Sequence, residues 1–274
     1  MIIAQTPLRI SFLGGGNMAE AIIGGLINGR VVEPRRIQVV DPNPDRQTLF
    51  HQRYRVTVVG VVDDPFFETD LIVVAVKPQV AEAALAPLAG RVDRVPLLSI
   101  MAGVPIARIQ SIVGPSEVVR AMPNTPALIG AGITALFAPE GVAAAARTLA
   151  EKTMQAVGET LWVGDETAID AVTAVSGSGP AYLFLFLEAL ARAGEQLGLP
   201  AETARRLAVA TALGAAKLAN AGPEPFEVLR ARVTSPGGTT AAALEVLLAA
   251  GWPHQLEEAV AAAYRRAREL AAGG

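Results

Sequence analysis

The chain has 274 residues, 51% of them hydrophobic, so it is long enough to bury the core of one large domain or of two. The formal net charge of −3 gives no sign of the basic surface that a nucleic acid or an anionic membrane attracts. The sequence has no cysteine, which excludes disulfide bonds, a thiol nucleophile and a thiolate metal site, and we predict no metal centre.

The N-terminal residues lack the pattern of a secretion signal, in which a charged segment precedes an apolar run and a cleavage site. The most apolar predicted helix, residues 181–198, is interrupted by Glu188 and Arg192. We interpret it as too short and too charged to span a bilayer. We therefore expect a soluble cytoplasmic protein that binds neither membranes nor nucleic acids.

In the first part of the chain, short β-rich runs alternate with helical ones. The predicted strands are residues 8–14, 36–41, 56–59, 71–76, 95–100, 117–122, 132–138 and 159–163. Helical patterns lie between several of them, at 17–28, 79–89 and 140–157. This alternation is typical of an α/β protein with a Rossmann-type, doubly wound parallel sheet.

A glycine turn separates the first predicted strand from the first predicted helix. Gly14, Gly16 and Ala19 have the G-x-G-x-x-A spacing, in which glycines let backbone N–H groups approach a pyrophosphate. We expect this turn, with Asn17 and Met18, to bind a nicotinamide dinucleotide. The alternative is a glycine turn that serves close packing and binds no ligand.

The end of the second predicted strand bears on which nucleotide is bound. Asp41 follows that strand at the position where an acid accepts from a ribose 2′-hydroxyl, which favours NAD(H). Arg46 follows shortly after, where it would suit a 2′-phosphate and favour NADP(H), or where it is simply a solvated charge at a helix start. The sequence leaves the choice between NADP(H) and NAD(H) open.

Two later strand ends are expected at the same edge of the sheet. The stretch "VVAVKPQV" ends the fourth strand, and we assign Ala75, Val76, Lys77 and Pro78 to the cofactor site. The alternative for Lys77 is a strand-end lysine in water. The stretch "RAMPNTPA" predicts a rigid loop, whose Asn124 we assign to the substrate site.

Beyond Gly164 the strand pattern stops and only helical periodicity continues. The predicted helices are residues 166–175, 179–197, 200–219, 224–231, 239–250 and 253–271. The stretch "SGSGP" breaks the first of them, either as a capped turn or as a ligand loop. We therefore predict a dinucleotide-binding domain at 1–164 and an all-α domain at 165–274.

The stretch "VTSPGGTTAAALEVL", residues 233–247, opens one of these helices in an unusual way. Ser235 is predicted as its N-cap and Pro236 as its first helical residue. Gly237 and Gly238 follow, although each glycine costs about 1 kcal/mol relative to alanine inside a helix. An ordinary capped helix explains the serine and the proline but leaves the two glycines unexplained.

Together these stretches identify a family. "FLGGGNMAEAIIGGL", "AVKPQV", "AMPNTPA", "AVSGSGPAYLFLFLEAL", "LGAAKL" and "VTSPGGTTAAALEVL" occur in the order seen in pyrroline-5-carboxylate reductases, and the chain resembles them from about Ile10 to Leu270. The resemblance implies NAD(P)H-dependent reduction of 1-pyrroline-5-carboxylate to L-proline, the last step of proline synthesis. It also implies a C-terminal dimerisation domain that forms at least a homodimer, assembled further in some members.

The same resemblance makes Thr240 the hydroxyl that hydrogen-bonds the substrate nitrogen, and we assign it as catalytic. A helix N-terminus with glycines suits the substrate carboxylate. The predicted substrate-binding residues are Ser235, Gly237, Gly238, Thr239, Thr240 and Asn124. No side chain is assigned as a proton donor, and His51 and His254 are expected at the surface. Residues 220–233 lack the Glu-His-Pro-like run of many relatives, so no residue is assigned there.

Two other functions remain open at this point. A related imine reductase or β-hydroxyacid dehydrogenase would share the organisation, but hydroxyacid oxidation needs a general base. Lys152 and Lys217 are the lysines available outside the first domain's core, and neither lies in a glycine-flanked motif. A non-enzymatic nucleotide-binding paralogue is expected to have lost the substrate loop, which this chain retains.

Overall fold

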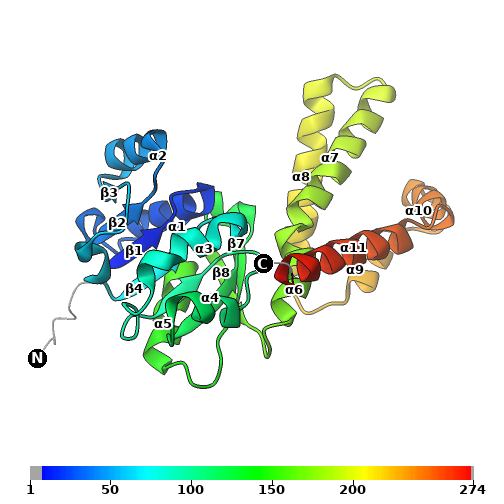
Figure 1. Ribbon diagram of the computed structural model, residues 1–274. Helices are drawn as coiled ribbons and strands as arrows, with labels where there is room; N and C mark the ends of the chain where they lie inside the picture. The colour runs from blue at the N-terminus through cyan, green and yellow to red at the C-terminus, as the bar shows by residue number, and fades with distance from the viewer. Residues whose placement is uncertain (1–7, 273–274) are drawn as a thin grey trace, which may run out of the picture. The chain divides into compact units, whose positions relative to one another are not determined.

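The computed structural model describes residues 8–272, and the chain divides into two compact units. Unit 1 runs to Ser178 and takes in the end of the chain from Ala263, whereas unit 2 is Gly179–Ala262. Figure 1 shows the sheet and its helices in unit 1, and a unit 2 made of helices alone. The predicted α/β fold with an all-helical second part is confirmed.

Unit 1 is built on an eight-stranded sheet with the order β3-β2-β1-β4-β5-β6-β7-β8. Its strands are β1 (Ile10–Leu13), β2 (Ile37–Val40), β3 (Thr57–Val59), β4 (Leu71–Val74), β5 (Leu97–Ser99), β6 (Val118–Met122), β7 (Gly132–Phe137) and β8 (Gly158–Trp162). Each lies within a predicted strand or within one residue of it. All residues of β1 and β4 are buried, as expected for central strands covered on both faces.

The sheet is not parallel throughout, which corrects the prediction. Strands β1 to β6 run parallel, but β7 pairs with β6 in the antiparallel sense and then carries β8 parallel to itself. A parallel crossover needs a dozen or more residues. Only a short loop with the five-residue 3₁₀ helix η6 (Thr125–Ile129) joins β6 to β7, so the chain reverses there.

Helices cover both faces of this sheet (Figure 1). On one face α1 (Asn17–Asn28) and α5 (Ala144–Gln155) bury apolar side chains against Phe12, Val39 and Val73. On the other, α3 (Ala81–Leu85) and α4 (Ile106–Val113) pack against Val40 and Val74. Three elements are absent from those predicted: α4, α2 (Pro44–Leu49) and the π-helical turn η2 (Phe50–Tyr54) that follows α2.

The division between units falls later than the predicted boundary near Gly164. Helix α6 (Ala168–Val172) and the π-helical turn η7 (Thr173–Gly177) belong to unit 1, because α6 packs on β6 and β7. Unit 2 then comprises α7 (Gly179–Gln196), α8 (Ala201–Asn220), α9 (Phe226–Arg232), α10 (Thr239–Ala249) and the first part of α11 (Trp252–Ala272). These helices match the predicted ones within a few residues.

Unit 2 has very little core of its own. Among its residues only Ala204 and Ala208 are buried, whereas Phe184 is 64% exposed and Leu185 is 68% exposed. Such a wide exposed apolar surface marks an interaction site. By length and composition alone, the helical stretch Ala168–Gln196, which includes α6, η7 and α7, could also cross a membrane, but one such helix is weak evidence, and the prediction that residues 181–198 do not span a bilayer stays a prediction.

Candidate active site

The carboxyl ends of the parallel strands carry the predicted cofactor residues. Gly14 follows β1 with a φ of +99°, and its N–H donates to the Val40 carbonyl at 2.8 Å. A Cβ at Gly14 would lie 2.8 Å from the Ala75 carbonyl oxygen and 2.9 Å from a Val76 side-chain carbon. The structure therefore brings Gly14, Ala75 and Val76 together, and only glycine fits the turn.

The middle glycine of the loop is required for a different reason. The Gly15 N–H donates to Asp41 Oδ2 at 2.8 Å. A Cβ at Gly15 would lie 2.7 Å from the Phe50 ring and 3.1 Å from that carboxylate oxygen. The glycine thus lets the loop approach Asp41, which stands directly after β2.

Gly16 has no such packing reason. The space beside it shows whether the turn has room for a dinucleotide. A Cβ built on Gly16 meets nothing within 4 Å, and its φ of −70° is open to any residue. Gly16 is the N-cap of α1, and no side chain caps that helix. Its first N–H groups are therefore available to an anion in the space beside Gly16, as a pyrophosphate requires.

The remaining predicted residues of unit 1 occupy this edge with different exposures. Asn17 is exposed, Met18 is half-buried and Ala19 is buried in the core. Lys77 is exposed at the carboxyl end of β4 and is the N-cap of a short 3₁₀ helix that Pro78 opens. The structure gives Lys77 the position expected of either alternative.

Asn124 follows β6 at the same edge and has a structural partner. Its Oδ1 accepts from the Ile133 N–H at 3.0 Å, so the side chain fixes the start of β7. Its amide nitrogen is the donor that remains for a ligand. Asn124 is thus placed near the carboxyl edge, with half of its hydrogen-bonding capacity already used.

Arg46 is held by contacts within unit 1 and is not a solvated charge. Its Nε donates to the Gly15 carbonyl at 2.6 Å and its Nη2 to Glu20 Oε2 at 2.8 Å. Its guanidinium lies over the Phe50 ring, 5.1 Å from the centroid. The side chain is only 21% exposed, so the prediction of a solvated charge is wrong, whereas a contact with a 2′-phosphate stays a prediction.

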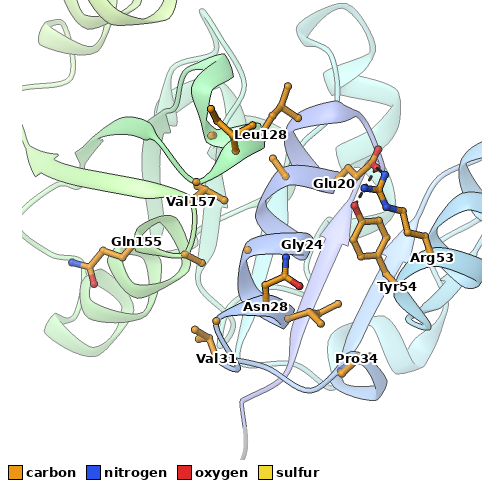
Figure 2. Close-up of a pocket in the computed structure, with 18 of the residues that line it drawn as sticks. Glu20, Gly24, Asn28, Val31, Pro34, Arg53, Tyr54, Leu128, Gln155 and Val157 are labelled. Atoms are coloured by element: carbon orange, nitrogen blue, oxygen red, sulfur yellow. Dashed lines mark hydrogen bonds and ion pairs between the residues drawn. The ribbon is translucent and has the colours of Figure 1, made fainter. Parts of the chain in front are cut away.

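Glu20 is a residue that the sequence analysis missed. It lies in the first turn of α1, and its Oε1 also accepts from Arg53 at 3.0 Å and from the Tyr54 hydroxyl at 3.1 Å (Figure 2). Burial, together with the Glu20 charge and hydrogen bond, raises the pKa of Tyr54, so that its hydroxyl stays a donor. An acid directly after the glycine motif, with arginines at 46 and 53, is the signal that points to this cluster.

The pocket drawn in Figure 2 lies elsewhere in unit 1. It has a volume of about 1260 Å³ and is lined by α1, η6 and α5, with Glu20, Tyr54, Leu128 and Gln155 among its residues. None of the predicted cofactor or substrate residues lines it. Lys152 does line it and is exposed, as is Lys217 in α8, so neither lysine occupies a buried catalytic position.

In unit 2, the start of α10 differs from the prediction. The helix begins at Thr239 with Gly238 as N-cap, so Ser235 is not the N-cap and Pro236 is not the first helical residue. Instead the Gly238 N–H donates to the Ser235 carbonyl at 3.0 Å. Gly237 has a φ of +70°, and proline followed by a left-handed glycine is the pattern of a type II turn. The turn explains Pro236 and Gly237 together.

This turn leaves the N-terminus of α10 open. No side chain caps the helix, and a Cβ at Gly237 would meet nothing within 4 Å. Thr239 is exposed and Thr240 is half-buried in the first turn. Backbone N–H groups and two hydroxyls therefore gather at one helix end, which suits a small carboxylate.

The two histidines take no part in either arrangement. His51 is exposed in η2, and the His254 side chain is 73% exposed beside Glu257 and Glu258.

The segment before α9 has a structural role, because Glu224 pairs with Arg232 at the other end of that helix. Within residues 8–272, no group of three or more metal-ligating side chains occurs.

Two family models match the chain, one in its N-terminal part and one in its C-terminal part. Residues 166–270 match the family described as pyrroline-5-carboxylate reductase dimerisation. Residues 9–103 match the family described as NADP oxidoreductase, coenzyme F420-dependent. The first match covers the helices of unit 2, and the second covers the glycine loop and Asp41.

Named relatives align over nearly the whole chain. The pyrroline-5-carboxylate reductase of Pseudomonas aeruginosa is 45% identical over 97% of this chain and 98% of its own. A solved pyrroline-5-carboxylate reductase from Coxiella burnetii is 40% identical, covers 97% of this chain and 99% of its own, and has a TM-score of 0.90. The Plasmodium falciparum pyrroline carboxylate reductase, solved with NADP bound, is 26% identical over 96% and 98%, with a TM-score of 0.87.

Proposed function

The chain belongs to the pyrroline-5-carboxylate reductase family, and from this premise we propose how its own residues serve the reaction. It is an NAD(P)H-dependent oxidoreductase that reduces 1-pyrroline-5-carboxylate to L-proline, the final step of proline biosynthesis. The roles of individual residues below are our proposal.

Unit 1 supplies the cofactor site at the carboxyl edge of its sheet. The open N-terminus of α1 beside Gly16 holds the pyrophosphate, and Gly14, Ala75 and Val76 shape the floor of the turn. Asn17, Met18, Lys77 and Pro78 line the rest of the site, and Asp41 holds the adenosine ribose. The bound dinucleotide supplies the hydride that reduces the imine carbon.

Unit 2 supplies the substrate site at the N-terminus of α10. The backbone N–H groups that follow Gly237 and Gly238 hold the carboxylate, supported by the helix dipole. The Thr240 hydroxyl hydrogen-bonds the ring nitrogen and so orients the imine. Ser235 and Thr239 border this site. In unit 1 we propose Asn124, through its amide nitrogen, as a further substrate-binding residue. These groups bind and orient, and none of them is a strong acid or base.

One observation carries the substrate assignment: a type II turn with left-handed Gly237 leaves α10 uncapped and its first hydroxyls in place. The two competing functions receive less support. A hydroxyacid dehydrogenase needs a base, and Lys152 and Lys217 are both exposed. A paralogue that only binds nucleotide has no use for an open helix end of this composition.

The chain is a homo-oligomer, because its helical part is the dimerisation domain of the family. We propose a homodimer as the smallest assembly, in which a second copy covers the exposed apolar surface of α7 and α8. On this proposal the apolar helix of Ala168–Gln196 meets protein and not lipid. We further propose that the protein works in the cytoplasm as a soluble enzyme.

The direct test is an assay of the purified protein with 1-pyrroline-5-carboxylate and either NADH or NADPH. Oxidation of the dinucleotide should match the L-proline formed, mole for mole. Parallel reactions with β-hydroxyacids and with imines that lack a carboxylate should be slower by orders of magnitude. Loss of NAD(P)H without proline, or no turnover by a protein that binds the nucleotide, would overturn the proposal.

A further inference from the structure

The adenosine end of the predicted cofactor site has a negative charge on Asp41, which backbone N–H groups hold in place, and a positive charge on Arg46, which is already paired within unit 1. We infer that this chain selects NADH over NADPH, because Asp41 accepts from the ribose 2′-hydroxyl while Arg46 is engaged by Gly15 and Glu20. The inference rests on the proposed function only in that unit 1 binds a nicotinamide dinucleotide. It goes against the NADP named for its relatives.

Two backbone donors hold the Asp41 carboxylate in place. Oδ2 accepts from the Gly15 N–H at 2.8 Å, and Oδ1 accepts from the Asn43 N–H at 2.9 Å. The Asp41 N–H in turn donates to the Val59 carbonyl at 3.0 Å, so main chain and side chain are both fixed. The carboxylate cannot turn aside for a bulkier ligand without giving up these bonds.

The held carboxylate can still accept from a ribose. A carboxylate has about four lone-pair sites, and the two backbone donors occupy only two of them. Asp41 is half-buried, so part of it faces solvent. The ribose hydroxyls of NADH can donate to it. A 2′-phosphate has no donor when ionised and brings a second negative charge to the same place, which opposes binding.

Arg46 is the cation that would otherwise compensate for that charge. Its Nε is used by the Gly15 carbonyl, its Nη2 by Glu20, and its face by the Phe50 ring. The Glu20 side chain is only 16% exposed and also accepts from Arg53 and Tyr54. Two of its five N–H donors are thus engaged, and moving the guanidinium from these partners toward a phosphate would break both hydrogen bonds and take one partner from a largely buried carboxylate.

The same contacts give Arg46 a different task. It joins the glycine loop, through the Gly15 carbonyl, to α1, through Glu20. Gly15 therefore receives both of its polar contacts from the segment that follows β2: its N–H goes to Asp41 and its carbonyl accepts from Arg46. Arg46 shapes the loop for either nucleotide and does not discriminate between them.

Binding without the imine tests the inference separately from the reaction. Dissociation constants of NADH and NADPH are measured by fluorescence titration, and those of 5′-AMP and 2′,5′-ADP by calorimetry. NADH is expected to bind roughly 10- to 100-fold more tightly than NADPH, the range for a hydrogen bond to a charged group. Likewise, 5′-AMP should bind more tightly than 2′,5′-ADP. Equal binding, or tighter binding of NADPH, overturns the inference whether or not the protein reduces pyrroline-5-carboxylate.

Asp41→Ser should bring the two dissociation constants at least tenfold closer, by weakening NADH and strengthening NADPH. Glu33→Gln is the matched control, because it also removes one negative charge but lies exposed before β2, at the opposite end of the strand from Asp41. Its ratio should equal that of the wild type. An unchanged ratio in Asp41→Ser, or an equal shift in Glu33→Gln, contradicts the inference. If Asp41→Ser does not fold, the wild-type ratio still decides.

Arg46→Ala distinguishes a role of Arg46 in shaping the glycine loop from direct binding of the 2′-phosphate. Since Arg46 acts on the loop, the variant should weaken NADH and NADPH by the same factor and leave their ratio unchanged. A selective loss of NADPH binding would show that Arg46 reaches the 2′-phosphate, and the inference would fail.

Discussion

Arg120 in β6 and Glu166 before α6 lie 46 positions apart, and Arg120 Nη1 donates to Glu166 Oε1 at 3.2 Å. The Arg120 side chain is 2% exposed, and its Nη2 also donates to Asp170 at 3.4 Å. The same Glu166 oxygen accepts from the Ile106 N–H at the start of α4, at 2.7 Å. One buried cation thus joins β6 and α6, and its carboxylate partner also holds α4.

Removing a partner of this cation should destabilise unit 1. Asp170→Ala leaves Arg120 buried with one carboxylate in place of two, which should cost about 3 kcal/mol. Thermal unfolding at a fixed protein concentration measures this as a clear drop in Tm. Glu140→Ala, an exposed carboxylate of the same unit, is the control and should leave Tm unchanged. Equal Tm values for the two variants would show that the buried pairing contributes nothing.

Gly16→Val tests the pyrophosphate site. The added side chain enters space that no protein atom occupies, so the fold should survive, but it blocks the path of the phosphates. NADH binding should fall at least about a hundredfold, since several N–H contacts are lost together. Gly141→Val, also in open space within unit 1, is the control for the substitution itself. A folded Gly16→Val protein with unchanged NADH affinity would refute the site.

Gly237→Ala tests the turn before α10. Alanine at a φ of +70° is strained by about 1 kcal/mol, and the turn should shift the N–H groups that hold the substrate carboxylate. We expect a raised KM for the imine and an unchanged Kd for NADH. Gly90→Ala carries the same strain, at a φ of +69° and in open space, but lies in unit 1. If both variants lose stability and neither changes KM, the turn has only a structural role.

Leu185→Asp tests the proposed dimer surface. Leu185 is 68% exposed on α7 in the single chain, so a charge there should be harmless to a monomer and costly in an apolar interface. Sedimentation should show a dimer or larger for the wild type and a shift toward monomer for the variant. Val61→Asp places the same charge at a 74% exposed position of unit 1 and should keep the assembly intact. A monomeric wild-type protein would contradict the proposal.

The sequence was sufficient for the elements with strong periodicity. The buried strands and the helix at Asn17–Asn28 were predicted because long apolar runs and the glycine motif mark them. Short elements such as α4, and α2 with η2, were not predicted, because one or two helical turns give too little periodicity in the sequence. The reversal of β7 depends on the length of a loop, which an alternating pattern of strands does not reveal.

In the site, residue types could be predicted but their partners could not. Asp41 was identified from its spacing, yet its bond to Gly15 and the pairing of Arg46 with Glu20 join segments more than 20 residues apart. Ser235 and Pro236 matched a helix start as well as a turn, and the left-handed Gly237 decided for the turn. Local sequence propensity does not predict these hydrogen-bond partners or this turn, because they depend on the three-dimensional structure.

Thr240→Ala tests whether the N-terminus of α10 holds the substrate. Losing one polar contact to the substrate costs about 1–3 kcal/mol, which is roughly ten- to a hundredfold in kcat/KM for 1-pyrroline-5-carboxylate. Thr239→Ala should cost less, and Thr203→Ala, an exposed threonine in α8, should match the wild type. We expect this loss in Thr240→Ala with an unchanged Kd for NADH and an unchanged Tm. Full kcat/KM with a lowered Tm would show that Thr240 only supports the helix and does not bind the substrate.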